Sequence, residues 1–195
     1  FSNYFLHNSD VTIDTKRHKI SFHSKPEDNW EITLVDTGLH TQTGGRLKRV
    51  YNYLKNDDIF CLTYGDGLSN INIKDLIKYH KSHKKMATIT AVVPPGRFGS
   101  IDLDKNLNIK SFVEKPSSNT SFINGGFFVM SPKCIKQIKD DNSVLEVETL
   151  NHLVKNKQIK TYLHKGFWQP MDTLREKNLL ETMWNEKKAP WKVWK

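Results

Sequence analysis

Apolar residues alternate with polar ones in two segments near the start of the chain. One covers residues 11–22, with a polar turn in its middle, and the other is Trp30–Val35. Because the side chains of a strand point to alternate faces, this period of two predicts a hairpin and a further strand. Uninterrupted apolar runs are typical of buried strands. They predict strands at Ile59–Tyr64, Met86–Val93, Ile109–Val113, Ile123–Met130 and Ile159–Leu163.

Between these strands the apolar residues recur at helical intervals, as in a helix with one buried face. This spacing predicts helices over Arg46–Leu54, Ile73–His83, Leu145–Val154 and Thr173–Trp184. Pro132, after Ser131, opens a short additional helix. The alternation of helices and strands favours an α/β sandwich around a largely parallel sheet.

Composition narrows the class of protein. With 195 residues, 37% of them hydrophobic and 26% charged, the chain is expected to form one globular domain over residues 1–195. No apolar stretch approaches the length of a membrane span, and the first residues lack the pattern of a secretory signal. Cys61 and Cys134 form no Cys-x-x-Cys motif, so neither a zinc ribbon nor a redox motif is expected. A reducing cytoplasm is the simplest compartment for such a chain.

The net charge of +9 is spread along the chain and is not gathered in one basic tract. This pattern favours a small phosphorylated substrate over a nucleic acid polymer, and no membrane partner is expected. Tryptophans at 184, 191 and 194 mark an aromatic tail over residues 185–195. The tail is expected to pack on the body of the protein or on another subunit.

Asp66 lies between Gly65 and Gly67, directly after the apolar run that ends at Tyr64. In open α/β sheets ligands gather at the carboxyl ends of the strands, where a lone aspartate can hold a divalent metal ion against a phosphate. A surface turn that binds nothing is the alternative.

Asp172 presents a similar choice at the start of the last predicted helix. Thr173 and Glu176 have the spacing of a capping box, and a carboxylate near a helix N-terminus is favoured by the helix dipole. Alternatively, Asp172 is a second metal ligand facing Asp66, since two carboxylates with phosphate oxygens and water suit Mg²⁺.

Two segments at strand ends carry further candidates. Lys115 could hold a phosphate and Glu114 could accept hydrogen bonds from sugar hydroxyls, unless the pair is a charged surface turn. Asn124 and Gly125 could let a ligand approach the backbone closely, unless the glycines only mark a bulge.

A third segment precedes a predicted helix. Gly44 and Gly45 could form an anion cradle of backbone N–H groups, to which Arg46 would add a fixed charge. The signal is weak because the Gly-Lys-Ser/Thr of a P-loop does not follow.

Taken in order along the chain, these segments resemble the sugar-nucleotide pyrophosphorylases, a nucleotidyltransferase family. The shared strings lie at residues 43–50, 63–67, 94–99, 114–116, 123–128 and 167–173, so the resemblance covers nearly the whole chain. The strings Thr-Gly-Gly-Arg-Leu-Lys-Arg and Phe-Trp-Gln-Pro-Met-Asp-Thr point to the branch that uses CTP. The resemblance implies a Rossmann-like three-layer sandwich with a mixed, mostly parallel sheet, and a homo-oligomer when full length.

The resemblance also implies a reaction, in which CTP and α-D-glucose 1-phosphate give CDP-glucose and pyrophosphate for CDP-sugar and O-antigen-type polysaccharide biosynthesis. Catalysis would then consist of positioning and charge neutralisation. By match of motif, Mg²⁺ is expected on Asp66 and Asp172. Arg46 and Lys115 are expected to act with these two aspartates in catalysis, and Lys115 to hold the sugar phosphate. The nucleotide is expected to lie against Thr41, Arg46 and Gly65. The sugar substrate is expected to contact Tyr64, Glu114, Lys115, Asn124 and Gly125.

The sequence departs from the family at its start, where the family's opening strand, its Gly-Gly-x-Gly-Thr-Arg loop and the following Lys-Pro segment do not occur. Because that strand is central in a doubly wound sheet, the chain, roughly the C-terminal three-quarters of a member, is expected to be poorly stable and nearly inactive alone. Two other classes stay open: a non-catalytic module that binds a sugar phosphate or nucleotide, and a metal-dependent glycosyltransferase, whose usual Asp-x-Asp is missing here. Within the family, another nucleotide could replace CTP.

Overall fold

A computed structural model describes residues 3–23, 30–95, 100–113 and 122–194 of the chain. The chain divides into two compact units, residues 1–36 and 37–195, and each is described by itself. The expectation of a single domain, with residues 185–195 as its tail, stays a prediction.

The first unit contains a short helix, α1 (Tyr4–Asn8), and the predicted hairpin, β1 (Val11–Asp14) with β2 (Lys19–Phe22). The two strands are antiparallel with Val11 opposite Phe22. The Asp14 carboxylate closes the turn by accepting the backbone N–H groups of the two residues at positions 16 and 17, at 3.1 and 3.0 Å. The alternating pattern therefore predicted this hairpin correctly.

The strand predicted at Trp30–Val35 is wrong, because this segment forms no strand. Its alternate apolar residues, Trp30, Ile32 and Leu34, are all exposed, and Trp30 packs only against the ring of Tyr4 among the described aromatic pairs. An alternating pattern becomes a strand only where a neighbouring strand accepts its backbone hydrogen bonds, and no described strand does so here.

The second unit is built on a four-stranded sheet in the order β3 (Phe60–Thr63), β8 (Ile123–Met130), β5 (Ala87–Val92), β9 (Ile159–His164). β8 is antiparallel to both β3 and β5, and β9 is parallel to β5. Three strands therefore run in one direction and β8 in the other. The sheet is mixed, as predicted, but it is not mostly parallel, because insertion of β8 makes two of its three strand pairs antiparallel.

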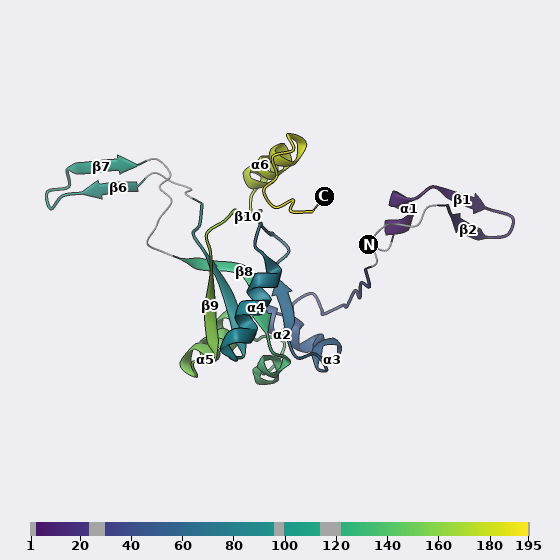
Figure 1. The fold of residues 1–195 in the computed structure, drawn as a ribbon, viewed down its shortest axis with the longest axis horizontal. Coiled ribbons are helices and arrows are strands. Elements are labelled where there is room, and N and C mark those ends of the chain that lie inside the picture. Colours follow the sequence, from purple (N-terminus) through teal and green to yellow (C-terminus); the bar gives the residue numbers. More distant parts are fainter. Residues whose placement is uncertain (1–2, 24–29, 96–99, 114–121, 195) are drawn as a thin grey trace. The chain divides into compact units, whose positions relative to one another are not determined.

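Successive residues of β8 are buried on opposite faces of this sheet. Phe128 and Met130 join a core with Leu47, Ile135 and Leu153. These last three come from α2 (Thr43–Arg49), the 3₁₀ helix η1 (Pro132–Gln137) and α5 (Leu150–Lys155). On the other face Val129 packs with Leu76 of α4 (Ile73–His83), which lies across the strands in Figure 1. The result is the predicted three-layer α/β sandwich.

Two predicted helices are interrupted. The helix predicted at Arg46–Leu54 is two pieces, α2 and α3 (Tyr51–Leu54), with Val50 between them. The helix predicted at Leu145–Val154 begins as a π-helical turn, η2 (Leu145–Thr149), and continues as α5. Apolar spacing survives such interruptions because both pieces bury the same side against the sheet.

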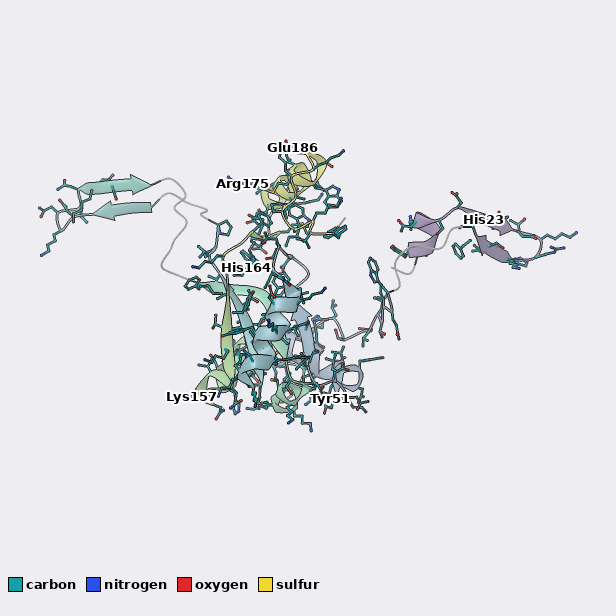
Figure 2. The ribbon with its side chains drawn as sticks, in the orientation of Figure 1. His23, Tyr51, Lys157, His164, Arg175 and Glu186 are labelled. Carbon is teal, nitrogen blue, oxygen red and sulfur yellow. The ribbon has the colours of Figure 1, made fainter. Side chains whose placement is uncertain are left out.

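Smaller elements complete this unit. The antiparallel strands β6 (Ser100–Leu103) and β7 (Ile109–Val113) form a second hairpin. Two short strands that were not predicted, β4 (Gly67–Ser69) and β10 (Trp168–Pro170), pair antiparallel. The last helix is α6 (Leu174–Asn185). In Figure 2 the labelled His164 lies where β9 leads toward β10, and its imidazole is hydrogen-bonded to the Ser69 hydroxyl of β4 at 3.1 Å.

Candidate active site

The pairing of β4 with β10 brings the two candidate aspartates to neighbouring positions. Pro170 lies opposite Gly67, and one step further the N–H of Met171 donates to the carbonyl oxygen of Asp66 at 2.7 Å. Asp172 is the next residue, and both aspartates are exposed. The backbones at Asp66 and Asp172, more than half of the chain apart in sequence, are thus neighbours in the fold, although Asp172 lines neither of the two cavities at the Asp66 turn.

Asp172 also stands at the capping box, which is confirmed. The Glu176 carboxylate accepts the N–H groups of Asp172 and Thr173 at 2.9 and 3.0 Å, and the Thr173 hydroxyl accepts the N–H of Glu176 at 3.3 Å. The side chains of Thr173 and Glu176 therefore perform the capping, to which Asp172 contributes its backbone. Helix capping at this position is therefore compatible with a metal-ligand role for the Asp172 carboxylate.

Two cavities meet at the Asp66 turn, and Tyr64 and Asp66 line both. The larger, an open cleft of about 680 Å³, is lined by Thr43, Thr63, Tyr64, Gly65, Asp66 and Glu146. The smaller, of about 40 Å³, is lined by Tyr64, Asp66, Gly67, Asn124, Gly125, Gly126, Trp168 and Pro170. The structure therefore brings together five of the predicted site residues: Tyr64, Gly65, Asp66, Asn124 and Gly125.

Tyr64 is held by both its ring and its hydroxyl. The ring packs edge-on against Phe128 with 5.6 Å between centroids, and the hydroxyl donates to the Glu146 carboxylate. Burial, and then the Glu146 hydrogen bond and charge, raise the pKa of the Tyr64 phenol well above its ordinary value. The phenol is thus a fixed, protonated donor at the junction of the two cavities.

The glycines of β8 are required by packing. A Cβ on Gly125 would lie 2.7 Å from Cγ1 of Val92. Gly126 has a φ of +77°, a backbone angle that residues with a side chain rarely adopt. The pairing of β5 with β8 is irregular between Ile89 and Ala91, opposite this segment. The glycines therefore mark a bulge, while Asn124 and Gly125 still line the smaller cavity.

Gly44 and Gly45 do not form an anion cradle. Their N–H groups donate to the carbonyl oxygen of Ser143 at 3.0 and 3.2 Å, and a Cβ on Gly45 would lie 2.6 Å from Asp141. The N–H groups of both glycines are therefore used by the chain's own backbone, and the predicted anion cradle is wrong.

Arg46 and Thr41 do not line either cavity. The guanidinium of Arg46 donates to the Thr37 hydroxyl at 2.7 Å and to the Leu39 carbonyl oxygen at 3.1 Å, and Thr41 is buried. Their contact with a nucleotide stays a prediction. Glu114 and Lys115 lie outside the described residues.

Among the cavity-lining residues that sequence reasoning missed, Glu146 is the charged one. It lies on the π-helical turn η2, accepts hydrogen bonds from Tyr64 and Thr43, and lines the larger cavity. Nothing local distinguishes it from Glu148 two residues later, because only the long-range contacts with Thr43 and Tyr64 define its position.

The donor set of the site suits a hard divalent cation. Among the described residues no group of three or more His, Cys, Asp or Glu side chains could hold a metal ion. Two aspartates therefore need oxygens from a substrate and water to complete the shell, which is the usual way in which Mg²⁺ binds with phosphates. Within the described residues, no helix combines the length and the apolar character needed to cross a membrane.

Comparisons with known proteins agree with this geometry. Residues 6–184 match the family described as Nucleotidyl transferase. A glucose-1-phosphate cytidylyltransferase of Salmonella typhi is 49% identical over 194 residues, covering 100% of this chain and 75% of that protein. A mannose-1-phosphate guanyltransferase of Saccharomyces cerevisiae is 34% identical over 142 residues, covering 68% of this chain and 39% of that protein.

The fold has solved counterparts. The structure of HddC from Yersinia pseudotuberculosis matches with a TM-score of 0.51 and 25% sequence identity, over 71% of this chain. This chain spans 60% of the length of that one.

Proposed function

The chain belongs to the nucleotidyl transferase family, and from that membership we propose that it transfers the cytidylyl group of CTP to α-D-glucose 1-phosphate. The products are CDP-glucose and pyrophosphate. The observation that carries the proposal is the identity of 49% with a glucose-1-phosphate cytidylyltransferase along the entire chain. The meeting of Asp66 and Asp172 through the pairing of β4 with β10 supports it independently.

In this reaction a phosphate oxygen of the sugar phosphate attacks the α-phosphorus of CTP. The bond from that phosphorus to the oxygen bridging to the β-phosphate breaks, and pyrophosphate leaves with that oxygen. No covalent bond to the protein forms, so the protein contributes orientation of the two substrates and a favourable charge environment.

Asp66 and Asp172 would hold Mg²⁺, which supplies positive charge against the reacting phosphates. Arg46 and Lys115 carry the positive charges predicted to act with them. Tyr64 and Asn124 present hydrogen-bonding groups beside the smaller cavity, and the sugar is assigned to that side of Asp66. The larger cleft, which reaches Gly65, is assigned to the nucleotide.

We extend the proposal to a cytoplasmic homo-oligomer. Large apolar side chains stay exposed on α6 and in the tail, namely Leu174, Leu179, Trp184, Val193 and Trp194. Burial of such side chains against another subunit would remove them from water, which favours association.

The test is pyrophosphate release by the full-length protein with glucose 1-phosphate and each of CTP, GTP and dTTP. Magnesium-dependent release with CTP, and much slower release with the others, is expected. Preference for GTP would favour the activity named for the more distant relatives, whose identity is 34%. Binding of glucose 1-phosphate without turnover of any nucleotide would favour a non-catalytic module.

A further inference from the structure

Glu146 connects parts of the chain that are remote in sequence. One carboxylate oxygen accepts the Tyr64 hydroxyl, 82 positions away, and the other accepts the Thr43 hydroxyl, 103 positions away, at 2.9 Å. Thr43 in turn accepts the N–H of Leu145 at 3.0 Å, so its proton is directed toward Glu146. These hydrogen bonds form a connected series, in which Thr43 orients Glu146 and Glu146 orients the Tyr64 hydroxyl.

The turn that carries Asp66 depends on Tyr64 for its position. The β3–β8 ladder ends with Thr63 opposite Phe127, and the N–H of Tyr64 makes a further hydrogen bond to Gly126 at 3.2 Å. On the far side, the Asp66 carbonyl oxygen accepts the N–H of Met171. Between these two links Gly65 contributes no side chain. The Tyr64 side chain is therefore an anchor of the turn, beside the 3.3 Å hydrogen bond from the Thr63 hydroxyl to the Tyr64 carbonyl oxygen.

We propose that Glu146 is a positioning residue of this site, which holds the Tyr64 phenol against the sheet and thereby fixes the Gly65–Asp66 turn between the two cavities. The inference rests on the proposed function for its kinetic consequences. Its structural basis is the double acceptance by Glu146, together with the packing of the Tyr64 ring on Phe128 and beside Gly126.

A carboxylate suits this position because it offers an acceptor oxygen to each of two hydroxyls. A glutamine can imitate it, since its carbonyl oxygen accepts from Tyr64 and its amide can donate to the Thr43 hydroxyl. A positioning role therefore tolerates Glu146→Gln but not Glu146→Ala. A role that needs the negative charge, such as a metal ligand or a general base, tolerates neither.

The kinetic test compares Glu146→Ala, Glu146→Gln and Tyr64→Phe in the full-length protein, with Glu148→Ala as a matched control on the same turn. Misplacement of catalytic groups by about 1 Å can lower the rate about 100-fold, so Glu146→Ala is expected to lower kcat by at least about tenfold. Both KM values should change less than kcat. Glu146→Gln and Glu148→Ala should stay within about threefold of the unchanged protein.

The double variant of Glu146→Ala with Tyr64→Phe should lose no more activity than the less active of the two single variants. Both changes break the same hydrogen bond, between Tyr64 and Glu146. Equal damage by Glu146→Gln and Glu146→Ala would overturn the proposal, as would multiplicative losses in the double variant.

A measurement without substrates separates this inference from the proposed function. Tyrosines are labelled as 3-fluorotyrosine, and the resonance that disappears in Tyr64→Phe is followed by fluorine NMR. Glu146→Ala is expected to shift or broaden this resonance, while Glu146→Gln and Glu148→Ala leave it in place. An unchanged resonance in Glu146→Ala would overturn the positioning role even in an active enzyme. Its displacement in a protein without cytidylyl transfer would leave the positioning intact and reject only the proposed reaction.

Discussion

Gly45 at the start of α2 and Gly65 at the end of β3 are both glycines beside a charged residue, but they have opposite surroundings. A Cβ on Gly45 would lie 2.6 Å from backbone atoms of Asp141, whereas a Cβ on Gly65 meets no described atom within 4 Å. The first glycine admits a loop of the same chain, and the second leaves room beside Asp66. Local glycine content signals a close approach, but the tertiary structure decides whether backbone or ligand makes it.

The largest effect is expected at the open turn. Asp66→Asn should lower the rate of pyrophosphate release by at least about 1000-fold, or about 4 kcal/mol of barrier, because it removes a charge at the proposed metal site. The unfolding midpoint should hardly move, since Asp66 is exposed. Asp58→Asn, an exposed aspartate before the opposite end of β3, is the charge-matched control. A normal rate in Asp66→Asn would show that the open turn binds no catalytic ion.

Substitution of Gly45, which is enclosed by backbone, should lower the stability of the protein. Gly45→Ala must displace the backbone at Asp141 and is expected to lower the free energy of unfolding by about 2–4 kcal/mol. Gly65→Ala, with open space around its new methyl group, should change it by less than about 0.5 kcal/mol. Urea titrations of the two variants compare them directly. Equal stability losses would remove the distinction between the two glycines.

The same distinction explains what the sequence could predict. Strands β3, β5 and β8 followed from apolar runs, and the capping box followed from Thr173 and Glu176, because these signals are local. The position of Asp66 at a strand end also followed from its neighbours. Local patterns therefore located the carboxylate that the cavities share.

Long-range contacts account for what was missed. The short strands β4 and β10 exist because they pair with each other, and Glu146 enters the site through Thr43 and Tyr64. Trp30–Val35 has the pattern of a strand but no described partner to pair with. Alternation and helical spacing indicate which side of one segment is buried. They do not show which distant segment it will pair with.

A smaller effect, on the pH dependence of stability, is expected from a buried polar cluster on the α4 face of the sheet. The imidazoles of His80 and His83 are both hydrogen-bonded to the Thr88 hydroxyl at 2.8 Å, and Thr88 is 0% exposed. Burial lowers the pKa of both histidines from the ordinary 6.5; His83 adds to the effect on His80, and the charges of Lys160 and Lys85 add to that on His83. The Tyr79 ring packs edge-on against His83 and against Tyr162.

Because the pKa of both imidazoles is lower in the folded chain than in the unfolded chain, the unfolded chain binds more protons near the ordinary pKa of 6.5. The free energy of unfolding should therefore fall as the pH falls from about 7 to about 5.5, by up to about 1.4 kcal/mol per pH unit for each imidazole. Urea midpoints across this range measure the slope. His83→Gln should flatten it, while the exposed His152→Gln should not. A slope unchanged by His83→Gln would contradict the assignment.

The smallest effect concerns the backbone that presents Asp172. Thr173→Ala removes one half of the capping box and should lower the free energy of unfolding by about 1 kcal/mol. Turnover should fall only slightly, since Glu176 still accepts the N–H of Asp172. A loss of activity as large as that of Asp66→Asn would show that Thr173 does more than cap the helix and would contradict this prediction.

Asp66 and Asp172, which follow the ends of β3 and β10, are proposed to bind one ion. The most direct test is a double-mutant cycle of Asp66→Asn and Asp172→Asn, with pyrophosphate release from CTP and glucose 1-phosphate as the readout. Two ligands of one ion act as a unit, so the double variant is expected to be no slower than the slower single variant, within about threefold. Losses that multiply in the double variant would show that the two aspartates act independently and would contradict the shared site.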